Sequence, residues 1–208
     1  MMVVKRNSTR AAFGAALASG PLLIGAVLGT SAHAYTNPNT LPATGSFTLN
    51  TAPGIVPAWE REDIVLTAIS PATATDLSVT ATTKLTMPVV AKTGSAVALS
   101  GGFRLTNTQT RETIRCMIPT VDTKALVLDC IVNVDENLQI FAIDAIKSRS
   151  SEVGLDSRTT QFTGMAFKVA SIATADQLNK ALSTSVFTSS VVIATGDLTV
   201  TWGSTTQS

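Results

Sequence analysis

The side chains in this sequence with the clearest potential for chemistry are two carboxylates, Asp129 and Asp144, and one guanidinium, Arg115. In the strand register that we expect, Arg115 and Asp144 are diagonal neighbours of Asp129 on the polar face of one sheet. Two neighbouring carboxylates are what a glycosidase uses as acid and base. An adjacent arginine would, however, lower the pKa of both carboxyls rather than raise one of them for a general acid. We therefore predict a structural ion cluster.

The elements that must position these residues are three predicted antiparallel strands, over 113–118, 124–132 and 138–147. Apolar residues recur there with a period of two, which is the side-chain repeat of a half-buried strand. We expect Cys116 to lie opposite Cys130, on the apolar face. That register places Ile118 opposite Leu128, Cys130 opposite Phe141 and Leu128 opposite Ile143.

Cys116 and Cys130 are the only cysteines of the chain. In an exported protein such a pair predicts a disulfide, which would contribute about 3 kcal/mol by closing a loop of about 15 residues. The alternative is two small buried thiols that never oxidise. A metal site is not expected, because the chain after residue 34 offers a soft metal only these two sulfurs and no histidine.

Residues 1–34 have the pattern of a cleaved secretory signal peptide. A basic start is followed by an apolar run over 11–29 and by Ala32-His33-Ala34, a small-x-small processing site. An uncleaved membrane anchor is the alternative reading of the same run. We expect cleavage, because glycines and a proline interrupt the run, and we predict a secreted or cell-envelope protein with no transmembrane segment in its mature part.

The chain after residue 34 carries 12 basic and 14 acidic residues, a balance that does not favour nucleic acid as a partner. Threonine accounts for thirty of its 174 residues, and together with many valines it favours strands. We expect an all-β fold: a flexible arm over 35–45, then a single antiparallel β-sandwich over 46–208. One short helix is predicted after Thr174, near the C-terminus, where Thr174-Ala175-Asp176-Gln177 has the form of a capping box.

Without histidine, Ser-His-Asp, Cys-His and histidine-metal mechanisms are excluded for the mature chain. No serine precedes a lysine by three residues, so a Ser-x-x-Lys dyad is absent as well. Carboxylate chemistry is what remains. We therefore predict no cofactor, no metal and no enzymatic activity.

The stretch 63–105, with its Thr/Val-rich strands and Gly101-Gly102-Phe103, resembles immunoglobulin-like domains exported by high-GC Gram-positive bacteria. This resemblance implies an immunoglobulin-like sandwich with a secreted, non-catalytic role. The ending, residues 176–182 followed by two strands, is similar to haem-binding surface domains of the same bacteria. The missing histidine departs from what haem ligation usually requires.

The leading hypothesis from sequence is a non-enzymatic binding or structural protein of the cell envelope with an unidentified envelope or extracellular partner. A secreted carboxylate-dependent hydrolase, with Asp129 and Asp144 as its acid pair, is one alternative. A carrier of an apolar ligand is another. That function requires a cavity of about 300 Å³ or more between the sheets, lined by Leu, Ile and Phe.

Overall fold

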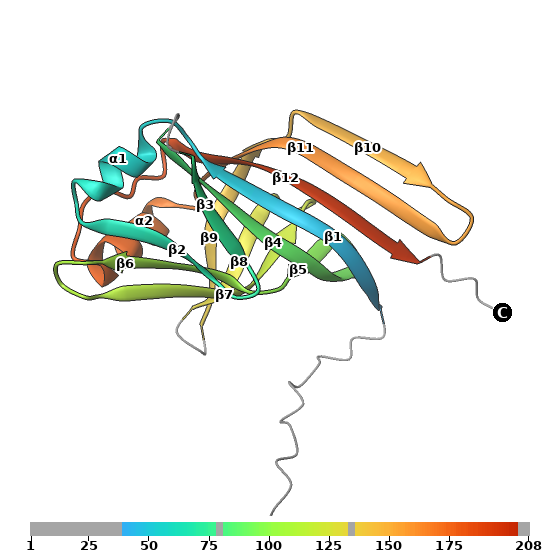
Figure 1. Cartoon of the computed structure of the whole chain (residues 1–208), viewed down its shortest axis with the longest axis horizontal. Helices are drawn as coiled ribbons and strands as arrows, with labels where there is room; N and C mark the ends of the chain where they lie inside the picture. The colour runs from blue at the N-terminus through green and yellow to red at the C-terminus, as the bar shows by residue number, and fades with distance from the viewer. Residues whose placement is uncertain (1–38, 78–80, 133–135, 204–208) are drawn as a thin grey trace, which may run out of the picture. The chain divides into compact units, whose positions relative to one another are not determined.

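β-Strands dominate the computed structural model, which describes residues 39–77, 81–132 and 136–203 (Figure 1). All of these residues belong to one compact unit. The predicted all-β class is therefore confirmed. The signal peptide predicted for 1–34 lies outside the described residues and stays a prediction.

Eight strands form a closed, barrel-like ring in which every neighbouring pair is antiparallel. The order is β7, β5, β4, β1, β12, β11, β9 and β8, and the ring closes because β8 also pairs with β7. The strands are β1 (Thr40–Thr51), β4 (Thr82–Thr93), β5 (Ala96–Leu99), β7 (Thr113–Asp122), β8 (Val127–Val132), β9 (Glu136–Ala145), β11 (Ser157–Val169) and β12 (Val192–Gly203).

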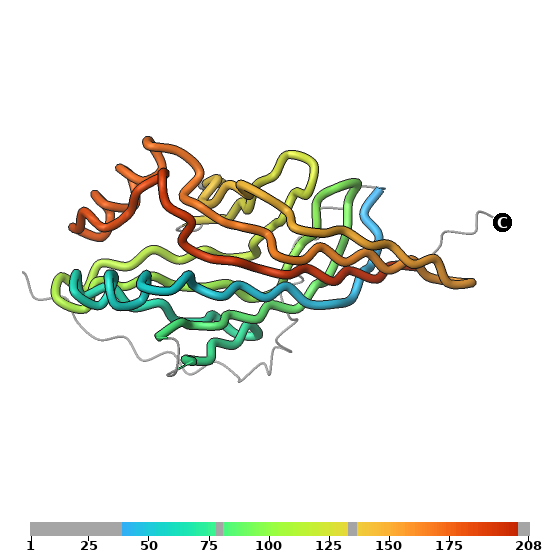
Figure 2. Tube along the Cα trace, turned by 90° about the horizontal axis from the view of Figure 1, so that it is seen from above, coloured from blue at the N-terminus to red at the C-terminus, as the bar shows by residue number. Residues whose placement is uncertain are grey.

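Four further strands extend the ring at its sides. β6 (Gly102–Asn107) pairs with β7, and β2 (Ile64–Ile69) pairs with β6. β3 (Thr73–Leu77) pairs with β4. β10 (Ser148–Val153) pairs with β11, and Figures 1 and 2 show that the β10–β11 hairpin and the end of β12 extend together to one end of the sheet.

The predicted immunoglobulin-like sandwich is not observed, because the strands form one sheet that closes on itself. Alternating apolar residues require only that each strand bury one face, and a sandwich and a barrel satisfy this equally well. The choice between them depends on β7, which pairs with β6 along its first half and with β5 along its second half, while β8 lies along it as well. No local sequence pattern encodes that branching.

β1 begins at Thr40, inside the stretch 35–45 expected as an arm. It can lie this close to β12 because of Gly45, whose φ is +134°. A Cβ atom at that position would come within 2.0 Å of the carbonyl oxygen of Thr199. A glycine is therefore required where the strand shifts register between Pro42 and Ser46.

The predicted C-terminal helix is present as α2, which spans Ile172–Ala181. Ser171 is its N-cap, and the Ser171 hydroxyl accepts a hydrogen bond of 3.0 Å from the Thr174 backbone N–H. The helix thus begins one turn earlier than the capping-box pattern at Thr174 indicates. Leu178 and Ala175 are buried and join the core.

A second helix, α1 (Ile55–Glu60), was not predicted from the charged run that follows it. Gly54, with a φ of +84°, precedes its first turn. Trp59 is only 5% exposed, and its ring lies 5.6 Å from that of Phe187. The tryptophan therefore anchors the helix to the core.

The interior of the ring is apolar and continuous. Phe47 from β1 and Phe167 from β11 are fully buried and meet edge to face, with ring centroids 5.7 Å apart. Phe141 and Leu128 are buried as predicted. Such close-packed aromatic and aliphatic side chains supply the main stabilising term of the fold.

The three antiparallel strands predicted over 113–147 are present as the meander β7, β8 and β9, but their register differs from the predicted one. Cys116 lies opposite Val132 and not opposite Cys130, and Leu128 lies opposite Val121 and Phe141. Most of the difference is set at the strand ends, where Asp122 pairs with Val127 and Val132 pairs with Glu136. The irregularities between Met117 and Thr120, and between Leu128 and Asp129, change the register by only one residue each. Ile118, at φ +48°, is 54% exposed and does not face the core as predicted.

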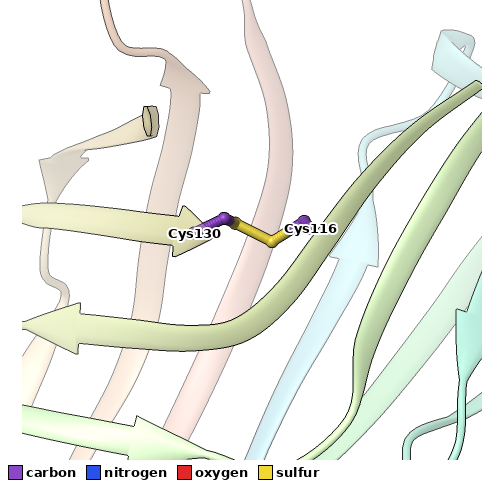
Figure 3. Close-up of a disulfide and its surroundings, with 2 residues drawn as sticks. All are labelled: Cys116 and Cys130. Carbon is purple, nitrogen blue, oxygen red and sulfur yellow. A yellow bond between two sulfur atoms is a disulfide. The ribbon is translucent and has the colours of Figure 1, made fainter. Parts of the chain in front are cut away.

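The predicted disulfide is present between Cys116 and Cys130, which are diagonal neighbours on β7 and β8 (Figure 3). Their Cα atoms are 5.0 Å apart, a separation that a disulfide normally spans. Both cysteines are buried. The β7 bulge thus brings the two sulfurs together although the residues are not direct partners.

Candidate ligand-binding pocket

The three residues of the predicted ion cluster have other neighbours in the structure. Arg115 lies opposite Arg104 of β6. Asp144 forms an ion pair of 2.5 Å with Lys168, which is the only ion pair within the described ranges. Asp129 lies opposite Thr120 and Gln139, where the expected register had Met117 and Ala142. The register shifts that separate these residues are the same ones that displaced the meander.

The pKa of Asp129 is raised, first by desolvation and then by the nearby Asp122 carboxylate. An acid whose pKa is higher in the folded state than in the unfolded chain costs stability once it ionises. The free energy of unfolding should therefore fall as the pH rises through the unfolded-state value of about 3.9 towards the folded-state value, and then level off.

Asp129→Asn removes this titration, so we expect the variant to be slightly more stable than the wild type near neutral pH. The two should become equal in acid, below the unfolded-state pKa. Urea unfolding followed by circular dichroism across this pH range measures the difference. Asp144→Asn is the matched control, because loss of its exposed pair with Lys168 should change stability by less than about 1 kcal/mol. A neutral-pH loss in Asp129→Asn would contradict the prediction.

A pocket of about 470 Å³ opens at the end of the ring where β10, β11 and β12 extend. Three groups of elements enclose it: the β4–β5 hairpin, the turn between β7 and β8, and the face of β10, β11 and β12. Its lining residues are Lys92, Gly94, Ser95, Val97, Thr123, Lys124, Arg149, Ser151, Arg158, Thr160, Phe162, Val200 and Trp202.

Alternation along the strands explains why these side chains share one face. Residues two apart in a strand point to the same side, and this applies to Arg158, Thr160 and Phe162 on β11. Arg149 lies opposite Phe162, and Arg158 lies opposite Trp202. One continuous face of three strands therefore forms the pocket wall.

Two of the basic side chains lie over aromatic rings. The Lys92 ammonium is 4.5 Å from the centroid of the Trp202 ring, and the Arg149 guanidinium is 5.2 Å from that of Phe162. Lys92 also donates a hydrogen bond to the carbonyl of Gly94. The contacts of Lys92 with Trp202 and of Arg149 with Phe162 are attractive cation–π interactions. The cations are thereby held at the pocket wall.

The pKa of Lys92 is lowered by desolvation and then by the positive charges of Arg158 and Arg149. The three cations therefore lie close enough to repel one another. None of the pocket-lining residues is Asp or Glu, and none of the four pocket cations forms an ion pair within the described part of the chain. The pocket lining is therefore electrostatically positive, with the Asp122 carboxylate beside Lys124 but outside the lining.

The carboxylate nearest to this site in the structure is Asp122, at the end of β7. Burial alone would raise its pKa, but hydrogen bonds from the N–H groups of Ala125 and Lys124, and from Ser95, bring the net shift below the usual value. The Asp122 Oδ1 atom accepts these two N–H bonds at 2.9 and 2.8 Å. The Asp122 carboxylate therefore stabilises the β7–β8 turn through these hydrogen bonds.

Sequence reasoning missed this site for an identifiable reason. The stretch from Ser148 to Arg158 has no alternating apolar residues to indicate a strand, whereas the structure has β10 and the start of β11 there. On β11 a bulge at Gly164, whose φ is +60°, lies between Phe162 and Met165. Side chains that face the core are therefore at even-numbered positions before the bulge and at odd-numbered positions after it. The period of two is thereby interrupted where the pocket residues are located.

Other concavities are smaller or less charged. A pocket of about 300 Å³ lies beside α1 and contains Glu60 and Asp76, and one of about 340 Å³ lies against α2 and is mainly apolar. Among the described residues no group of three or more His, Cys, Asp or Glu side chains is placed to hold a metal ion. Within the same residues no helix is long and apolar enough to cross a membrane.

No family model matches the chain, and no curated protein matches it. A search of solved structures finds a similarity to the haem-binding protein HtaB from Corynebacterium glutamicum. The TM-score is 0.46 at 12% sequence identity, and the match covers 78% of this chain and 95% of HtaB. The immunoglobulin-like resemblance is not shown.

Our leading expectation of a binding or structural protein of the envelope is corrected in favour of its alternative, a ligand carrier, because the structure contains a pocket large enough for a small molecule. The lining of the pocket changes the kind of ligand that this alternative implies. We expected a ligand cavity lined by Leu, Ile and Phe, whereas this pocket presents four cations and several hydroxyls beside its apolar side chains. Its chemistry therefore suits an anion rather than a purely apolar molecule.

Proposed function

We propose that this protein is an exported, non-enzymatic carrier of a small organic anion that has a flat or apolar body. The observation that carries the proposal is the positive pocket between the β4–β5 hairpin and the β10–β12 face. It combines four cations with two aromatic rings and contains no carboxylate among its lining residues. Disulfides persist mainly in oxidising compartments, so the Cys116–Cys130 bond is consistent with export.

The size and lining of the pocket support a small molecule. Binding sites for such ligands are typically about 300–1,000 Å³, with apolar walls and a few polar groups that fix orientation. Here Val97, Val200 and Phe162 are buried and supply the apolar wall. Arg149, Arg158 and Lys124 are exposed at the opening, where an incoming anion meets them first.

The pocket does not offer the usual ligands of haem iron. These are His, Cys thiolate, Met and Tyr, and none of them lines the pocket. A porphyrin carboxylate and ring could engage the cations and Trp202 without iron coordination. Metal-free porphyrin is therefore expected to bind with the same affinity as haemin.

The proposal is tested with naphthyl sulfonate as an aromatic anion and naphthol as its uncharged counterpart. We expect the wild type to bind the sulfonate, and the double variant Lys92→Gln/Arg158→Gln to bind it about tenfold or more weakly. The loss of even one charged hydrogen-bond partner, about 1.5–3 kcal/mol, corresponds to at least that factor. Isothermal titration calorimetry measures the affinity, and Trp202 fluorescence gives an independent readout.

Lys84→Gln is the matched control, since Lys84 is an exposed lysine on the same strand β4 and does not line the pocket. It should bind the sulfonate as the wild type does. Circular dichroism establishes that each variant is folded. Equal affinity of the wild type and the double variant, or equal affinity for naphthol and the sulfonate, would refute the anion-carrier function.

A further inference from the structure

We infer that the pocket selects a ligand whose anionic group carries two negative charges, a phosphate monoester or a pair of adjacent carboxylates, attached to a flat ring. This inference rests on the proposed function and narrows its ligand class. Three features of the pocket carry it: the convergence of cations, a lining that contains no carboxylate, and the half-buried Trp202.

The cations converge although they come from strands far apart in the sequence. Lys92 of β4 lies over the Trp202 ring of β12, and Arg158 of β11 is the direct partner of Trp202 across the sheet. Arg149 of β10 also acts on the charge of Lys92. Three positive charges therefore surround one region of the pocket.

A fourth cation approaches from the turn between β7 and β8. Lys124 lines the same pocket, and the neighbouring Asp122 carboxylate is engaged by its own turn. The charges that act on Lys92 are those of Arg158 and Arg149, while Lys124 lines the same pocket and interacts electrostatically with Asp122. A ligand with one negative charge would leave most of this repulsion in place, whereas a dianion relieves more of it.

The geometry of the donors also favours an anion with several oxygen atoms. Each guanidinium presents a planar fork of N–H groups that matches phosphate or carboxylate oxygens two at a time. The hydroxyls of Ser151 and Thr160 lie 3.2 Å apart and are hydrogen-bonded to each other, so the charged groups are the main donors for a ligand. The four cations carry more positive charge than a single sulfonate or carboxylate can neutralise.

The ring of the ligand has a place beside Trp202. This side chain is half-buried, and Lys92 lies over its ring. A flat ring that stacks near the tryptophan puts its attached anion within reach of Lys92 and Arg158. The volume of about 470 Å³ accommodates one ring system with its charged group.

The experiment compares naphthyl phosphate with naphthyl sulfonate, which share a ring and differ in charge. Near neutral pH we expect the phosphate to bind the wild type at least about tenfold more tightly. Arg158→Gln should reduce this ratio towards one, and Lys84→Gln should leave it unchanged. A phosphate monoester gains its second charge with a pKa of about 6, so its affinity should rise with pH through that value. The affinity for the sulfonate should not rise there.

The outcomes separate this inference from the function on which it rests. If neither compound binds, the carrier function fails. If both bind with the same affinity, or if the phosphate shows no rise near pH 6, the dianion selectivity alone is overturned. Liposomes containing phosphatidic acid present the same phosphate on a lipid. Tighter binding to them than to naphthyl phosphate would assign the site to a headgroup and overturn the small-molecule class.

Discussion

Replacing Phe167 by alanine is expected to lower the free energy of unfolding by about 3–5 kcal/mol, which is the usual cost of deleting a fully buried aromatic side chain. Phe167 has no exposed surface, and its ring meets that of Phe47 edge to face over strand β12, which lies between their two strands. The backbone of β12 packs closely against the ring, because a Cβ atom at Gly196 would lie 3.0 Å from it. The surroundings can therefore collapse little into the space left by the ring.

Urea unfolding monitored by circular dichroism measures this loss. Ile172→Ala is the control, since Ile172 is 73% exposed on α2 and its truncation should change stability by less than about 0.5 kcal/mol. A loss of similar size in both variants would show that the core is not organised around the Phe47–Phe167 contact.

Removing the disulfide should have the second-largest effect. The double variant Cys116→Ala/Cys130→Ala is expected to lose about 3 kcal/mol, because the bond closes a short loop and restricts the unfolded chain. The separation of 14 residues along the sequence sets the size of that loop. Both cysteines are buried, so the substitutions also remove packed sulfur atoms from the core.

The same stability measurement on the wild type with and without a reducing agent provides the control. Reduced wild type should fall to a stability close to that of the double variant. A double variant as stable as the oxidised wild type would contradict the prediction. It would also show that the β7 bulge holds the two strands together without the covalent bond.

Much of the fold was predictable from local patterns. The period-two apolar residues identified β7, β8 and β9, although with shifted ends, and they correctly indicated that Leu128 and Phe141 are buried. The pairing of Cys116 with Cys130 followed from their isolation and from the expected compartment. Such features depend on the residues themselves and on their nearest neighbours, which is why the sequence sufficed.

The register of the meander was not predictable in this way. A bulge inserts an extra residue in one strand, and its position is chosen by the strands on either side. Between Met117 and Thr120 that insertion leaves Ile118 exposed, while the pairing of Asp122 with Val127 next to the turn sets the neighbours of Asp129. The predicted cluster of Arg115, Asp129 and Asp144 depended on an uninterrupted ladder.

By itself, the sequence determined the strand-rich class, the disulfide and the absence of histidine chemistry from the described chain, because each follows from residue type or from short-range periodicity. Only the tertiary structure decided that the sheet closes into a ring and that Lys92, Lys124, Arg149 and Arg158 meet at one end of it. These cations lie on different elements, in a chain whose total charge is nearly balanced. The positive potential that they create together arises only when the ring has folded and has placed β4, the β7–β8 turn, β10 and β11 around one pocket. The physical reason is that electrostatic interactions depend on distance in space and not on separation along the chain.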